Sequence, residues 1–171
     1  MVDGVIQHLP RGGLAVEDSA KDFEDAYDSM LRLAYRAAYR LLGERAAAED
    51  VAGESLARAY SRWSSVSGHA EAWVVTVATN LALDAGRRRA RATGRQVELI
   101  EEGTVDDVDL RLDLQAAVRA LPRRQRQVVA LRFLADFSEA ATAAALAIDI
   151  GTVKSHASRG LSRLRTTVER V

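Results

Sequence analysis

The chain has 171 residues, no cysteine, and 24 basic against 24 acidic residues. The lack of cysteine excludes a disulfide framework and a thiolate metal site, and the three scattered histidines lack ligand-like spacing. No stretch approaches the roughly 20 apolar residues that span a bilayer, and no signal peptide is evident, so a cytoplasmic protein is expected. With 48% apolar residues, two prolines and no long alternating run, the sequence predicts an all-α fold.

The net charge of zero conceals a segregated distribution. Residues 87–95 hold five arginines and no acid, and residues 98–113 hold seven acids against Arg111 alone. From residue 114 onward ten cations face four acids, whereas before residue 87 eight cations face thirteen acids. Local basic surfaces of this kind are compatible with nucleic-acid binding despite the neutral average.

These shifts in composition divide the chain. Residues 1–20 have little periodicity and predict a flexible tail, and residues 21–91 have the pattern of a helical domain. Residues 92–112 are acidic and contain two glycines, which predicts a flexible, solvated linker. Residues 113–171 form a second helical domain, so the expected architecture is two small helical domains joined by an acidic linker.

The first domain begins with two predicted helices. Apolar residues recur at helical spacing over residues 23–42, and Gly43 is placed to end that helix. A second helix is predicted over residues 46–63, and its acidic surface is either merely solvated or a docking site. On the first helix, one side carries Tyr27, Leu31, Ala34, Tyr35, Ala38 and Leu42. On the second helix, the candidate buried positions are Val51, Leu56 and Tyr60.

A Ser/Gly-rich loop is predicted over residues 64–68, before a long helix that starts near Trp73. On that helix, Val74, Val77, Ala78, Leu81 and Ala85 are expected to face inward. A polar stripe runs along the other side, because four residues fall at positions i, i+4, i+7 and i+11: Asn80, Asp84, Arg87 and Arg91. An amide and several guanidiniums on one helix face can hold both bases and phosphates.

The second domain contains the pattern of a helix-turn-helix. After a helix that starts near Pro122, Ser138 can cap a short alanine-rich helix that runs to about Leu146. A tight turn over residues 147–149 leads to another helix, for which Asp149 is placed as N-cap. In a helix-turn-helix this last helix enters the major groove of DNA.

The last helix has two distinct faces. The residues expected to face a core are Val153, Ala157, Gly160, Leu161, Leu164 and Val168. The opposite face carries Ser155, Ser158, Arg159, Ser162 and Arg163, with Lys154 and His156 at its edges. Hydroxyls beside long cations suit a groove that presents base acceptors between phosphates. The alternative is an ordinary amphipathic helix with a solvated basic face.

Several runs of residues stand in an informative order along the chain. They are Ala48–Glu54, Leu56–Tyr60 with Trp63, Ala72-Trp73, Thr79–Asp84 before the arginines, Leu121–Val128, and Gly151–Ser155. In this order and spacing, residues 21–170 resemble the extracytoplasmic-function class of bacterial sigma factors, which are initiation subunits of RNA polymerase. Each motif is moderately specific, and their combination is strongly so.

The resemblance implies a factor that directs RNA polymerase to specific promoters and melts the minus-ten element. Its first domain, sigma region 2 over residues 21–91, would bind the clamp helices of the largest polymerase subunit. Its second domain, region 4 over residues 113–171, would read the minus-thirty-five element. The linker would run toward the RNA channel, and a separate anti-sigma factor is an expected partner. No catalytic residue, metal or cofactor is implied.

The functional residues follow from the same resemblance. Those assigned to core polymerase are Glu49, Asp50 and Glu54. Those assigned to minus-ten DNA are Ser64, Ser65, Ser67 and His69, in a loop that captures a flipped base, and Asn80, Asp84, Arg87, Arg88 and Arg91 on the next helix. Those assigned to minus-thirty-five DNA are Thr152, Lys154, Ser155, His156, Ser158, Arg159 and Arg163.

The sequence departs from the family pattern at three positions. Gly53 stands where a glutamine is usual, and His156 replaces a frequent arginine, so base preference does not carry over. Ala147 occupies a turn position that is usually glycine, because a tight turn there needs left-handed backbone. We expect Ala147 to keep that left-handed geometry, since Asp149 remains correctly placed as a cap.

Two other functions are compatible with parts of the sequence. A response-regulator output domain shares a reading helix of this type, but it leaves residues 46–91 unexplained. A sigma-like adaptor that binds regulators without DNA is the second alternative, and the intact arginine run argues against it. An enzyme is not expected, because no nucleophile, base and orienting group can be assembled from the sequence.

Overall fold

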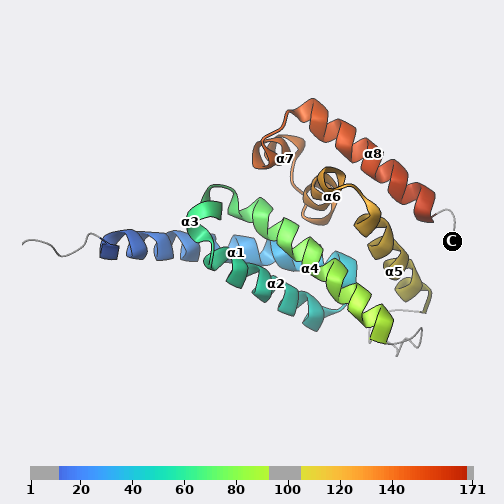
Figure 1. Ribbon diagram of the computed structural model, residues 1–171, viewed down its shortest axis with the longest axis horizontal. Coiled ribbons are helices and arrows are strands. Elements are labelled where there is room, and N and C mark those ends of the chain that lie inside the picture. The colour runs from blue at the N-terminus through green and yellow to red at the C-terminus, as the bar shows by residue number, and fades with distance from the viewer. Residues whose placement is uncertain (1–11, 93–104, 169–171) are drawn as a thin grey trace, which may run out of the picture.

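The computed structural model describes residues 12–92 and 105–168. The elements are α1 (Gly12–Leu42), α2 (Arg45–Tyr60), α3 (Trp63–Val66), a 3₁₀ turn η1 (Ser67–His69), α4 (Ala70–Ala92), α5 (Val105–Ala120), α6 (Arg123–Val129), a π-helical turn η2 (Ala130–Leu134), α7 (Glu139–Leu146) and α8 (Ile150–Val168). Every regular element within these ranges is helical, which confirms the all-α prediction. We refer to α1–α4 as the first unit and α5–α8 as the second unit (Figure 1).

Three segments predicted to be irregular are partly or wholly helical. Helix α1 begins at Gly12, inside the predicted tail, and α5 begins at Val105, inside the predicted linker. For α5, the acid-rich sequence suits a helix start as well as a linker, because acidic residues in the first turn of a helix complement the helix dipole. The segment predicted as a loop over residues 64–68 instead forms α3 and η1. The rest of the predicted tail, residues 1–11, and residues 93–104 of the linker lie outside the described residues.

The first unit packs α1, α2 and α4 around an apolar core. Met30 and Leu41 of α1 and Val74, Val75 and Leu83 of α4 are almost completely buried. Gly43 ends α1 as predicted, and its positive φ of 67° is a conformation that glycine adopts without strain.

An aromatic cluster closes one end of the first unit. Phe23 makes edge-to-face contacts with Tyr27, Tyr60 and Trp63 at centroid distances of 6.0, 5.0 and 5.1 Å. The prediction that Tyr60 is buried is wrong, since it is 58% exposed, and Tyr27 is 42% exposed. Helical spacing placed them on the correct side of their helices, but they flank Phe23 at the rim of the core.

The second unit packs α8 across α5, α6 and α7, as Figure 1 shows. Val128 and Val153 are completely buried, and Ala143 joins them. Gly160 allows α8 to approach α6 closely, since a Cβ there would lie 2.7 Å from Val129 Cγ2. Leu161 was predicted to be inside, but it is 39% exposed.

The turn between α7 and α8 keeps the left-handed geometry expected of it. Ala147 has φ 51° and ψ 49°, and the amide of Ile148 donates to the Ala143 carbonyl at 3.0 Å. This bond closes the C-terminus of α7 and aims the chain into α8.

None of the helices in the described part of the chain is both long and apolar enough to cross a membrane.

Because Ala147 is left-handed, Ala147→Gly should leave the melting temperature of the full chain unchanged or raise it. Glycine removes backbone strain on the order of 1 kcal/mol, partly offset by the greater entropy of unfolded glycine. Ala144→Gly, at an exposed position inside α7, is the matched control and should cost about 0.5–1 kcal/mol. Equal losses for both variants in thermal unfolding would contradict the left-handed turn.

Candidate nucleic-acid and polymerase interfaces

Two side-chain caps position the helix-turn-helix. Ser138 Oγ accepts a hydrogen bond from the Ala141 amide at 3.0 Å, which confirms it as N-cap of α7. Asp149 accepts from the Thr152 amide at 2.7 Å and from the Thr152 hydroxyl at 2.6 Å. The hydroxyl and then the amide of Thr152 hold the pKa of Asp149 below its ordinary value, so this cap is ionised at neutral pH.

The outward face of α8 matches the predicted reading face in most positions. Its exposed residues are Lys154, Ser155, Ser158, Arg159, Ser162 and Arg163. Lys154 lies 3.7 Å from Glu139 of α7, an exposed pair that a phosphate can displace.

Two of the assigned residues of α8 face partly inward. The Thr152 hydroxyl donates to the Asp149 carboxylate, so it serves the cap. His156 is half-buried, and its Nδ1 is buried without a hydrogen-bond partner. These two residues therefore lie at the edge of the exposed face, which includes Arg159 and the serines.

The polar stripe of α4 is exposed along its whole length. Its residues Asn80, Asp84, Arg87 and Arg91 are all exposed, and so is the neighbouring assigned residue Arg88. Asp84 accepts a hydrogen bond from Arg119 of α5 at 3.1 Å, so the stripe is in contact with the second unit.

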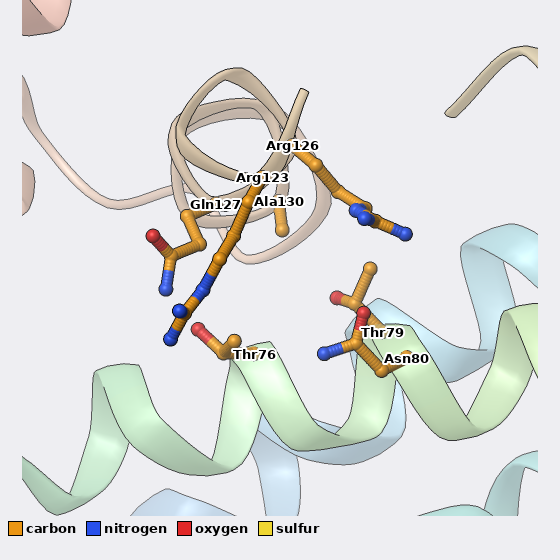
Figure 2. A pocket seen from close by; sticks show the side chains of 7 residues that line it. All are labelled: Thr76, Thr79, Asn80, Arg123, Arg126, Gln127 and Ala130. Atoms are coloured by element: carbon orange, nitrogen blue, oxygen red, sulfur yellow. The ribbon is translucent and has the colours of Figure 1, made fainter. Parts of the chain in front are cut away.

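A cleft of about 210 Å³ lies between α4 and α6. Figure 2 shows Arg123 and Arg126 extending from α6 toward Thr76, Thr79 and Asn80 of α4. Among the described residues, its lining includes two guanidiniums and no carboxylate, so the cleft favours an anionic group beside Asn80. This cleft was not predicted, because it depends on how the two units pack.

The residues assigned to base capture lie on α3 and η1, directly before α4. Ser64, Ser65, Ser67 and His69 are all exposed, and Ser65 Oγ donates to the Arg62 carbonyl at 2.9 Å. The buried side chains Trp63 and Val66 anchor this segment to the first unit. The four polar residues are thus presented from short helical turns on a fixed support.

The acidic residues assigned to core polymerase lie on α2. Glu49, Asp50 and Glu54 are exposed, and Glu54 pairs with Arg58 one turn later at 2.7 Å. The other side of α2 carries the buried residues Val51 and Leu56, so the acidic face points away from the core.

Two family models match the two units separately. Residues 26–92 match the model of sigma-70 region 2, and residues 111–164 match that of sigma-70 region 4. The first match spans α2, α3 and α4 and most of α1, and the second spans α6, α7 and most of α5 and α8. The two models together therefore account for the helices that carry all three groups of assigned residues.

Individual relatives agree with these matches. The chain is 34% identical to the ECF RNA polymerase sigma factor SigL of Mycobacterium tuberculosis, over 84% of this chain and 86% of the relative. It is also 34% identical to SigE of Mycolicibacterium smegmatis, over 90% of this chain but 66% of that longer protein. The solved sigma factor RpoE of Bartonella quintana, in complex with the anti-sigma factor NepR, superposes with a TM-score of 0.51 at 25% identity, over 87% of this chain and 98% of RpoE. The chain therefore belongs to the extracytoplasmic-function family of RNA polymerase sigma factors.

Proposed function

We propose that this sigma factor brings RNA polymerase to promoters by reading the minus-thirty-five element with α8. The observation that carries the proposal is the helix-turn-helix itself. The left-handed Ala147 and the Asp149 cap fix how α8 leaves the turn, and Ser155, Ser158 and Arg159 are exposed along its outer face. Serine hydroxyls and a guanidinium at this spacing can contact base edges, while flanking cations contact phosphates.

The minus-ten element is assigned to α4 together with α3 and η1. A base must leave the duplex before its pairing edge can be read, and it then needs polar partners on a rigid support. The exposed residues Ser64, Ser67 and His69 supply such partners, and Asn80 follows on the next helix. Arg87, Arg88 and Arg91 extend the same path and can hold the strand through its phosphates.

Core polymerase is assigned to the acidic face of α2. Glu49, Asp50 and Glu54 are exposed carboxylates, and the clamp helices are the expected partner. The role is one of binding and orientation in the cytoplasm, where transcription takes place, and it requires no catalytic group. A separate anti-sigma factor is proposed as a further partner, supported by the similar factor RpoE, which was solved bound to NepR.

The clamp assignment predicts that Asp50→Arg combined with Glu54→Arg abolishes co-purification with core polymerase. Both positions are exposed, so circular dichroism should show unchanged helicity. Glu54→Arg also removes the ion pair with Arg58, and Arg58→Ala is the matched control because it breaks that pair without reversing the face. Core binding that survives the double reversal, or that is lost in Arg58→Ala alone, would remove the clamp assignment.

The division between base reading and phosphate holding is tested in holoenzyme on a promoter fragment selected by run-off transcription from a genomic pool. Arg159→Ala should cost about 1–3 kcal/mol of binding and relax the preference at one position. Arg88→Ala should weaken binding to all fragments and reduce the salt slope by about one unit. The same salt slope for both variants would show that the division is incorrect.

A further inference from the structure

The cleft between α4 and α6 is lined by one face of each helix, since the lining residues of each helix recur at intervals of three and four positions. They are Thr76, Thr79 and Asn80 on α4, and Arg123, Arg126, Gln127 and Ala130 on α6 and the start of η2. Ala130 is small and almost completely buried, so it leaves space where the two faces meet. Asn80 is exposed, so a small molecule can enter the cleft from solvent at this point.

The chain before α6 is fixed to the first unit through Gln115 of α5. This side chain is 7% exposed, and its Nε2 donates to the carbonyl of Leu41 near the end of α1 at 2.8 Å. Its Oε1 occupies the space where Gly86 of α4 lacks a side chain, since a Cβ there would lie 1.7 Å away. Glycine inside a helix is unfavourable, so its presence within α4 is explained by this close approach.

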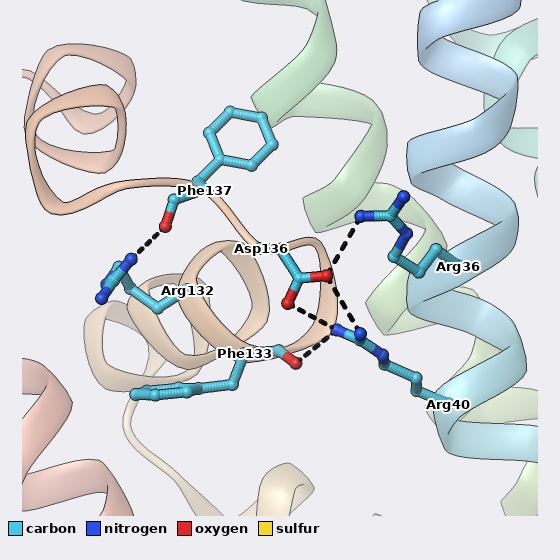
Figure 3. Close-up of polar contacts among 6 residues, drawn as sticks. All are labelled: Arg36, Arg40, Arg132, Phe133, Asp136 and Phe137. Atoms are coloured by element: carbon cyan, nitrogen blue, oxygen red, sulfur yellow. Dashed lines mark hydrogen bonds and ion pairs between the residues drawn. The ribbon is translucent and has the colours of Figure 1, made fainter.

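The chain after η2 is fixed to the first unit through Asp136. Its carboxylate accepts hydrogen bonds from Arg36 at 3.0 Å and from Arg40 at 2.9 and 3.0 Å (Figure 3). Arg40 also donates to the Phe133 carbonyl at 2.8 Å. The segment that carries the arginines of the cleft is therefore attached to the first unit at both ends, which fixes the width of the cleft.

The two arginines of the cleft lack an anionic partner in the part of the chain that the structure describes. Arg123 is exposed and Arg126 is half-buried, and neither guanidinium makes a hydrogen bond or an ion pair with a described residue. They are three residues apart on one face of α6, where like charges destabilise a helix. An anion bound between α6 and α4 would offset this repulsion.

The positions of the donors favour a phosphoryl group over a carboxylate. Figure 2 shows Arg123, Arg126 and Gln127 on the α6 side of the cleft and Asn80 on the α4 side, so donors approach from both walls. A phosphoryl group has three terminal oxygens that point in different directions and can accept from both walls, whereas a carboxylate has only two, in one plane. Its charge of about −1.5 to −2 at pH 7 also matches two guanidiniums.

The size of the cleft limits what can accompany the phosphoryl group. Its volume of about 210 Å³ is smaller than the roughly 300–1,000 Å³ of pockets that enclose drug-sized ligands. A phosphoryl group fits inside, and a larger substituent on it would project into solvent past Asn80.

We propose that this cleft binds the phosphoryl group of a small molecule, which is either free phosphate or a phosphate monoester. Arg123 and Arg126 hold the oxygens through charge-assisted hydrogen bonds, and the amides of Gln127 and Asn80 donate from the two walls. The ligand therefore bridges α4 and α6. The site is independent of the proposed function, because its occupancy can be measured with neither DNA nor polymerase present.

The test titrates inorganic phosphate into the full chain at low ionic strength and measures the heat of binding and the melting temperature. Binding should be saturable and raise the melting temperature, because a ligand that binds only the folded chain stabilises it. Arg123→Gln removes one charge, and Arg126→Lys keeps the charge but loses the bidentate geometry. Each should weaken binding about tenfold or more, as expected for the loss of a hydrogen bond between charged groups. Asn80→Ala, on the opposite wall, should weaken it about threefold or more.

Arg124→Gln is the matched control, because Arg124 is exposed on the same helix, has the same charge and does not line the cleft. Its contact with Gln127 is an exposed hydrogen bond at 3.3 Å, so its loss should change the affinity for phosphate far less than Arg123→Gln does. Equal weakening in the two variants would show that the general charge of α6 attracts the anion, and the proposal would be overturned. Failure of phosphate to bind the folded chain, with helicity checked by circular dichroism, would overturn it as well.

The source of the phosphoryl group is distinguished by a second series of probes. Tighter binding of adenosine monophosphate than of phosphate would identify a monoester as the ligand, and equal binding would identify free phosphate; both results support the site. Acetate should bind about tenfold more weakly than phosphate, and equal binding of the two would overturn the preference for a phosphoryl group. If only a single-stranded oligonucleotide without a terminal phosphate binds, and Arg126→Lys weakens it, the cleft is a nucleic-acid contact and the proposal fails.

Discussion

Helix α4 packs against α1 and α2 on one side and contacts α5 and η2 of the second unit on another. The arrangement of the whole molecule depends on this constraint. Val74, Val75 and Leu83 are buried against α1 and α2, and these contacts fix the rotation of α4 about its axis. With 3.6 residues per turn, the same rotation turns Asn80 and Asp84 outward. The core of the first unit therefore decides which polar residues are presented to DNA or to the second unit.

Local rules account for the parts of the site that were predicted correctly. Ser138 and Asp149 are caps because a short polar side chain before a helix satisfies the free amides of its first turn. Ala147 is left-handed because the geometry of the turn requires it, although this backbone conformation is unfavourable for alanine. Each of these features is determined by residues within a few positions, so the sequence pattern is sufficient to recognise it.

The contacts between the units could not be predicted in the same way. Asp136 and Arg36 are 100 residues apart, and the pattern around each residue is that of an ordinary exposed charge. Gly86 is the one signal that was available, because an isolated glycine within a strong helical pattern often marks a close approach. Its partner, Gln115, could be identified only from the packing of α5 against α1 and α4.

The signs of the charges show that specific pairing, rather than bulk attraction, orients the two units. Residues before 87 carry more acids than cations, and residues from 114 onward carry more cations. The pair of Arg119 with Asp84 follows this trend, but Asp136 reverses it, since an acid of the basic unit meets two arginines of the acidic one. General attraction between opposite charges would permit many orientations, whereas an inverted pair stabilises only the orientation that brings Asp136 to Arg36 and Arg40. The orientation of the second unit over α4 is therefore encoded in particular side chains.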